Sequence, residues 1–176
     1  QSGKHPGKTN ITDVDNALNI LRHLTERPTV SIMKHNNPCG VAMADTLAEA
    51  YHKANMADRI AAFGGCIALN RPVDTDTAKL ISENYAEVVV APEYEEGTLG
   101  ILATRKNLRI VRVDAMHKLA QFAHERVIDF KSLMDGGLIV QTSFVPRPRS
   151  REDLMVAECE YKGKTYRVKR EPTDAE

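Results

Sequence analysis

A lysine and a histidine stand next to each other at the end of an apolar run, as Lys34 and His35 in the segment 31–40. A histidine can accept a proton near neutral pH, and a lysine ammonium can stabilise an oxyanion that develops in a transition state. Residues at a strand end that precede a loop often face a ligand rather than the core. The alternative interpretation is a surface lysine beside a histidine bonded to a loop carbonyl, because structural networks also place charged groups side by side.

The residues around this pair predict a strand followed by a turn. The apolar run 30–33 is typical of a strand. Asn36, Asn37 and Gly40 tolerate positive φ and Pro38 fixes its own φ, so we expect a loop directly after the histidine.

The composition restricts the class of protein. The chain has 176 residues, which is enough for one domain with a core and short for two. Its 24 basic and 24 acidic residues give a net charge of zero, which argues against broad electrostatic binding to nucleic acid. No apolar run reaches the length of a membrane helix, about 20 residues. We therefore expect a protein that binds neither a membrane nor nucleic acid.

The cysteines indicate a cellular compartment, and the two ends of the sequence indicate that the natural chain is longer. Cys39, Cys66 and Cys159 are unevenly spaced and odd in number, which fits reduced thiols in a cytoplasmic protein better than a disulfide framework. The chain begins without methionine or signal peptide. It ends on Thr173 and Glu176, which together form a helix-start signature. We expect the natural chain to continue.

Four helices are predicted from apolar residues at helical spacing. The first would be capped by Thr12 or Asp13 and the second by Thr46, because Thr and Asp side chains accept from free helical N–H groups. The third is expected over 75–85 and the fourth over 94–106. The apolar residues that define the first helix are Val14, Ala17, Leu18, Leu21 and Leu24, with Pro28 ending it.

Four strands are predicted between these helices, over 30–33, 66–69, 88–92 and 108–113. Regular alternation of strands and helices predicts an α/β layer fold with a largely parallel or mixed sheet. Gly64 and Gly65, just before the second strand, predict a tight turn that also forms a pocket wall, because no Cβ intervenes.

The last third of the chain is less regular. Residues 119–130 show no single period, 138–140 predict a short strand, and Lys162-Gly163 predicts a hairpin turn. The segment 146–151 carries local positive charge, which we interpret as a solvated linker rather than a nucleic-acid patch.

Taken together, these segments resemble AICAR transformylase, the formyltransferase half of the bifunctional purine biosynthesis protein. Residues 34–40 resemble its Lys-His-x-Asn-Pro-Cys-Gly motif, and 58–69 resemble its Ser/Ala-Phe-Gly-Gly stretch. Segments 74–79, 87–92 and 136–141 fit later parts of the family, so the resemblance covers nearly the whole chain in order.

The resemblance implies a cytidine-deaminase-like α/β fold, layered, with a mixed sheet and flanking helices. Residues 1–176 would be the first of two similar subdomains. The second subdomain, an upstream Arg-Tyr-Gly-x-Asn-Pro-His-Gln motif and the cyclohydrolase domain are absent from this sequence. Active sites of the family lie at a homodimer interface, so self-association is expected.

The resemblance also implies a reaction. The family transfers a formyl group from 10-formyltetrahydrofolate, its cosubstrate, to the 5-amino group of AICAR, and no metal is expected. By resemblance, His35 is the proton acceptor or shuttle and Lys34 stabilises the transition state. Gly64, Glu87 and Asn37 are the corresponding substrate-binding positions.

Two other functions compete with this one. A zinc deaminase would need His-x-Glu and Pro-Cys-x-x-Cys, but Pro38-Cys39 is followed by Gly40, Val41 and Ala42, and no His-x-Glu occurs. The second alternative is a non-catalytic module that binds AICAR or serves as a partner subunit, because the folate half-site is absent.

Overall fold

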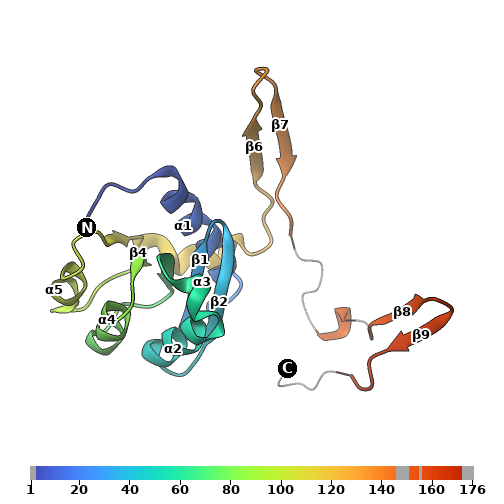
Figure 1. Cartoon of the computed structure of the whole chain (residues 1–176), viewed down its shortest axis with the longest axis horizontal. Coiled ribbons are helices and arrows are strands. Elements are labelled where there is room, and N and C mark those ends of the chain that lie inside the picture. The colour runs from blue at the N-terminus through green and yellow to red at the C-terminus, as the bar shows by residue number, and fades with distance from the viewer. Residues whose placement is uncertain (1–2, 146–150, 155, 172–176) are drawn as a thin grey trace. The chain divides into compact units, whose positions relative to one another are not determined.

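A computed structural model of the chain describes residues 3–145, 151–154 and 156–171 (Figure 1). The chain divides between Ala123 and His124 into two compact units.

The first unit is built on a five-stranded sheet with the strand order β2-β1-β3-β4-β5. Strand β1 pairs antiparallel with both β2 and β3, whereas β3, β4 and β5 run parallel. The predicted α/β class with a mixed sheet is therefore confirmed. The strands are β1 Thr29–Lys34, β2 Asn37–Met43, β3 Gly65–Leu69, β4 Ala86–Ala91 and β5 Arg109–Arg112.

Helices cover both faces of this sheet and give three layers (Figure 1). Helices α2, α4 and α5 pack on one face, and α1 packs on the other together with a 3₁₀ helix, η1. Their bounds are α1 Lys8–Leu21, α2 Leu47–Ala57, α4 Thr75–Ser82, α5 Thr98–Ala103 and η1 Asp114–Phe122, and a single turn, α3 Arg59–Ala62, follows α2.

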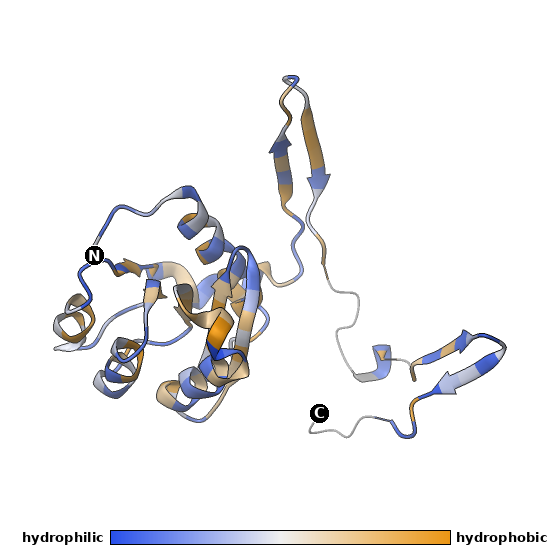
Figure 2. Cartoon of the chain, in the orientation of Figure 1, coloured by the Kyte–Doolittle hydropathy of each residue, from blue (hydrophilic) through white to orange (hydrophobic). Residues whose placement is uncertain are grey.

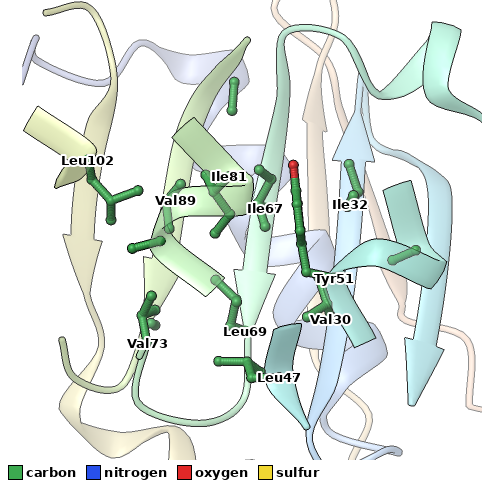
Figure 3. Packing of buried hydrophobic residues seen from close by; sticks show 14 of the residues in the cluster. Val30, Ile32, Leu47, Tyr51, Ile67, Leu69, Val73, Ile81, Val89 and Leu102 are labelled. Carbon is green, nitrogen blue, oxygen red and sulfur yellow. The ribbon is translucent and has the colours of Figure 1, made fainter. Parts of the chain in front are cut away.

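The core on the α2 face is formed by strand residues of alternating orientation packed against helix residues (Figure 3). Val30 and Ile32 of β1 face this side, whereas the next residue, Met33, faces α1. Burying each such aliphatic side chain contributes about 1.5–3 kcal/mol. The labelled members in Figure 3 are Val30, Ile32, Leu47, Tyr51, Ile67, Leu69, Val73, Ile81, Val89 and Leu102.

Helix α1 begins earlier than expected. It starts at Lys8, so Thr12 and Asp13 are not its caps. The N–H of Gly7, the N-cap residue, donates to Oδ1 of Asn10 at 3.0 Å, and Gly7 has no side chain that could cap the first turn. The helix ends at Leu21, so Leu24 and Pro28 lie beyond it.

The starts of α2 and α4 agree with the sequence, whereas α5 begins at Thr98 rather than 94. The Thr46 cap of α2 is confirmed, since its Oγ1 accepts from the N–H of Glu49 at 3.2 Å. Asp74 caps α4, which stops at Ser82 rather than 85. Helix α5 is shorter than 94–106, because the backbone of Tyr94 forms a bridge with Val73 and Gly97, with φ +84°, directly precedes the helix.

The second unit contains two hairpins. β6 Ile128–Ser132 pairs with β7 Leu138–Thr142, and β8 Glu158–Tyr161 pairs with β9 Lys164–Arg167. The sequence predicted β7 and the Lys162-Gly163 turn, but it did not predict β6. Residues of β6 and β7 are exposed; apolar and polar positions alternate along β6, whereas β7 begins with three apolar residues, 138–140 (Figure 2).

Two predicted segments fall largely outside the residues that the structure describes. Residues 146–150 of the predicted linker, and both Thr173 and Glu176 of the predicted helix start, lie outside the described residues. In the described ranges, no helix combines the length and the apolar character needed to span a membrane.

Candidate functional site

Lys34 and His35 lie at the tip of the β1–β2 hairpin. Lys34 pairs with Asn37, which leaves His35 and Asn36 as a two-residue turn. Their φ angles are 54° and 65°, so both residues have the left-handed backbone of a type I′ turn.

The expected loop over 36–40 is therefore wrong beyond its first residue. Asn37 to Gly40 belong to strand β2. Pro38 is tolerated there because β2 is an edge strand of the sheet. The register shifts after Ile32, so Cys39 forms a bulge opposite β1.

Helix α1 holds the turn from the other side. The N–H of Asn36 donates to Oδ1 of Asp13 at 2.7 Å, and Nδ2 of Asn16 donates to Oδ1 of Asn36 at 3.2 Å. Asp13 is buried, with 5% of its surface exposed. Within the turn, Nδ2 of Asn37 donates to the carbonyl of His35 at 3.0 Å. The turn is thus fixed by α1 and by Asn37.

A cavity of about 370 Å³ opens where this hairpin tip meets the start of α3. Asp58 belongs to the α3 side, and its carboxylate accepts from the N–H of Ala61 at 2.9 Å. The cavity therefore offers an ammonium, an imidazole, a carboxamide and a carboxylate to one ligand. Its lining residues are Lys34, His35, Asn37, Pro38, Cys39, Asp58 and Ala61.

The ammonium of Lys34 is oriented by the glycine-rich turn. Its Nζ donates to the carbonyl of Phe63 at 2.7 Å. Only one of its three N–H donors is needed for this bond, so the others can reach a ligand. Lys34 therefore links the hairpin tip to the segment before β3.

Cys39 is not a ready nucleophile in this cavity. Burial raises the pKa of the Cys39 thiol, and the carboxylates of Asp58 and Asp13 raise it further, whereas the Lys34 ammonium lowers it. Burial has the largest effect, so the thiol keeps its proton at neutral pH.

Gly64 and Gly65 form the tight turn that the sequence predicted. Gly64 has φ +77°, and its N–H donates to the carbonyl of Tyr85 at 2.8 Å. A Cβ on Gly65 would lie 2.9 Å from the carbonyl oxygen of Met33, so only glycine lets β3 approach β1 here. Because the N–H of Gly64 is already used, a ligand would contact its carbonyl or displace Tyr85.

Glu87 is the second residue of β4 and does not precede the strand. Gly65 pairs with Ala86 and Cys66 with Val88, so the register skips Glu87. Its carboxylate accepts from Nδ2 of Asn10 at 3.0 Å and lies 3.6 Å from the Arg109 guanidinium.

The candidate residues lie at the same end of the sheet, where these strands begin or end, but they do not all line one cavity. Because β1 runs antiparallel to β3, its C-terminal end lies beside the N-terminal ends of β3 and β4. Lys34, His35 and Asn37 line the cavity, and Gly64 is next to Phe63, the partner of Lys34. Glu87 lies two strands away from Lys34 at the same end.

Sequence reasoning missed Asn10 and Asp13, which bond to Glu87 and to the hairpin turn. The available signal was that the two residues are three positions apart and so share one face of a helix. Instead, Asn10 was assigned to a loop and Asp13 to a helix cap. Among the described residues, no group of three or more His, Cys, Asp or Glu side chains could hold a metal ion.

Comparison with known proteins identifies the family. The family model for the AICARFT/IMPCHase bienzyme matches residues 1–175. The chain belongs to this family.

Curated members of the family are similar over most of the chain. Bifunctional purine biosynthesis protein PurH of Sorangium cellulosum is 40% identical over 174 residues, which covers 99% of this chain and 30% of that protein. PurH of Myxococcus xanthus is 40% identical over 148 residues, covering 84% of this chain and 29% of that protein. PurH of Lactobacillus delbrueckii subsp. bulgaricus is 44% identical over 141 residues, covering 80% and 26%. The chain thus spans under a third of the length of these relatives.

Proposed function

We propose that this chain is the first subdomain of an AICAR formyltransferase that acts in purine biosynthesis. The complete protein would transfer a formyl group from 10-formyltetrahydrofolate to the 5-amino group of AICAR. The observation that carries the proposal is the shared cavity of Lys34 and His35 at the tip of the β1–β2 hairpin. Family membership over residues 1–175 supports it.

The reaction needs a base and a cation, and this cavity offers both. The amine of AICAR is conjugated to an imidazole carboxamide, so it is a poor nucleophile and must lose a proton as it attacks the formyl carbon. The proton passes to His35 and then to the tetrahydrofolate nitrogen as its bond to the formyl carbon breaks. The tetrahedral intermediate carries an oxyanion, which the Lys34 ammonium stabilises.

The nucleotide would lie along this end of the sheet. The carbonyl of Gly64 and the carboxamide of Asn37 supply polar contacts near the reacting amine. Glu87 suits ribose hydroxyls or amide donors, because a carboxylate accepts such bonds strongly. Asn10 and Arg109 hold that carboxylate in place.

Further features belong to the same proposal. The three-layer arrangement is compatible with a cytidine-deaminase-like fold, and the complete enzyme would be a homodimer. The cysteines of the chain are free thiols, which fits a cytoplasmic enzyme.

The test uses the complete protein that contains this segment. Formation of tetrahydrofolate is followed by absorbance with AICAR and 10-formyltetrahydrofolate present. His35→Ala is expected to lower kcat by about 10²–10⁴-fold, the range for losing general acid–base catalysis. His52→Ala on the exposed face of α2 is the matched control and should keep full turnover.

A binding measurement separates the enzyme from a non-catalytic module. If the complete protein binds AICAR by calorimetry but forms no tetrahydrofolate, the proposed enzyme activity is wrong and the binding module is right. Full turnover by His35→Ala would show that another group takes the proton.

A further inference from the structure

We propose that Asp13 of α1 is a positioning residue for Lys34 and His35. Its carboxylate holds the β1–β2 turn in the left-handed conformation that presents this pair to the cavity. The inference rests on the proposed function, because it concerns how the catalytic pair is held.

The turn has an unfavourable sequence for its conformation. A type I′ turn needs positive φ at both central residues, and Asn-Gly is its preferred sequence. Here the residues are His35 and Asn36, with φ of 54° and 65°. A Cβ disfavours this region for both residues, but the short polar side chain of asparagine can offset the cost by local hydrogen bonding, which the histidine ring does less readily. Such a conformation persists where the surrounding structure enforces it, and it is frequent at functional sites.

The enforcing contact comes from a residue 23 positions earlier in the chain. The N–H of Asn36 donates to Oδ1 of Asp13 at 2.7 Å. A hydrogen bond to a carboxylate is stronger than one between neutral groups. Asn16, one turn later on the same helix face, donates to the side chain of Asn36 at 3.2 Å. Two residues of one helix thus hold both the main chain and the side chain of Asn36.

The helix itself is firmly placed against β1. Ala17 and Leu21 of α1 are fully buried in a cluster with Met33, the residue before Lys34. Asp13 therefore has a fixed position relative to the strand that carries the pair. The turn is held between a strand and a helix that already pack together.

Asp13 acts through the turn and not on the ligand. It does not line the cavity that holds Lys34 and His35. A turn that needed only stability could use glycine at either central position. Instead the chain keeps a histidine there and supplies a buried carboxylate. A shift of about 1 Å in a catalytic group can cost about 10²-fold in rate.

The test compares Asp13→Ala with Asp15→Ala in the complete protein, since Asp15 is an exposed acid on the same helix. Asp13→Ala is expected to lower kcat by about 10–100-fold, with the Kd for AICAR within about threefold. Asp15→Ala should keep both values. Asp13→Asn retains an acceptor oxygen and should lower kcat by less, about threefold to tenfold; it carries the test if Asp13→Ala does not fold.

Restoration of kcat by a second substitution is the decisive measurement. Glycine is the preferred second central residue of a type I′ turn, so Asn36→Gly favours this turn without the carboxylate and leaves His35 in place. Adding Asn36→Gly to Asp13→Ala should restore kcat at least about fivefold, with no such gain in the wild-type background. A lower Tm with unchanged kcat per AICAR-binding site would mean that Asp13 only stabilises the fold. Loss of kcat that glycine does not restore would also overturn the inference.

His35→Ala, measured in parallel, separates this inference from the proposed function. If His35→Ala abolishes turnover while Asp13→Ala keeps it, only the positioning role is wrong. If His35→Ala keeps full turnover, another group takes the proton and the positioning role of Asp13 fails, whereas the proposed function fails only if the complete protein forms no tetrahydrofolate.

Discussion

Nζ of Lys34 donates a hydrogen bond to the main-chain carbonyl of Phe63 at 2.7 Å, across 29 residues of sequence. This bond ties the tip of the β1–β2 hairpin to the glycine turn before β3. The ammonium is therefore pre-oriented before any ligand enters, as electrostatic stabilisation of a transition state requires.

Removing this ammonium tests its role. Lys34→Ala in the complete protein is expected to lower kcat by about 10²-fold or more, because an oxyanion would lose its cationic partner. Affinity for AICAR, measured by calorimetry, should change little. Lys53→Ala, which breaks only an exposed pair with Glu49, is the control. An equal loss of affinity with unchanged kcat would make Lys34 a substrate-binding residue instead.

Glu87 should act on binding. Glu87→Gln is expected to weaken AICAR binding by about 1–3 kcal/mol, the scale of a hydrogen bond to a charged group. Asn10→Ala should produce part of this loss, because Asn10 holds the carboxylate. The exposed acid Glu96 provides the control as Glu96→Gln. Unchanged calorimetric affinity in Glu87→Gln would make this residue a structural ion-pair partner of Arg109.

Gly64 should be intolerant of a side chain. Gly64→Ala places a Cβ at φ +77° and 3.3 Å from Cε1 of Tyr85, so we expect a loss of about 1–2 kcal/mol in unfolding free energy. Gly100→Ala in α5 meets no atom within 4 Å and should gain about 0.5–1 kcal/mol. Urea unfolding of both variants measures the contrast. Equal stability of the two would contradict the assigned turn.

Stability should fall at alkaline pH. Burial raises the pKa of Tyr51 to about 12, although its bond from Asn84 lowers it somewhat. The folded chain therefore holds this proton more tightly than the unfolded chain, which releases it near pH 10. The stabilisation is complete below about pH 10 and is lost as the pH rises toward 12. Urea unfolding between pH 8 and pH 11 should show a shallower decline for Tyr51→Phe than for the natural sequence.

The chain of 176 residues alone should not transfer formyl groups. It covers 30% of the Sorangium cellulosum relative, and positioning of a second reactant contributes about 7–11 kcal/mol to a barrier. We expect tetrahydrofolate formation by the complete protein and none by this chain. Turnover by the chain near that of the complete protein would show that the cavity beside His35 suffices.

Local patterns predicted much of the first unit. Residues 88–91 of β4 form a continuous apolar run, and Asp74 directly precedes α4, so both elements could be predicted from the sequence. Strand β2 was not, because Asn37 and Pro38 carry turn chemistry and only their pairing with β1 makes them a strand. Strand β6 was missed because 119–130 joins a 3₁₀ helix to a strand and so has no single period.

The candidate site divides in the same way. Lys34 and His35 could be chosen from residue type and adjacency. The bond from Asn36 to Asp13 and the bond from Asn10 to Glu87 join residues 23 and 77 positions apart, and no local pattern predicts such contacts. Three-dimensional packing decides them.

The antiparallel placement of β1 beside β3 has a practical consequence. The candidate site lies at the end of the sheet where β3 and β4 begin, so the loops that follow these two strands lie at the opposite end. Glu96, exposed in the loop after β4, is a suitable anchor for a dye or a surface attachment. A protein with Cys159→Ser that is immobilised through Glu96→Cys would be attached at the end of the sheet opposite the Lys34–His35 cavity, so ligand binding could be observed directly on a sensor chip.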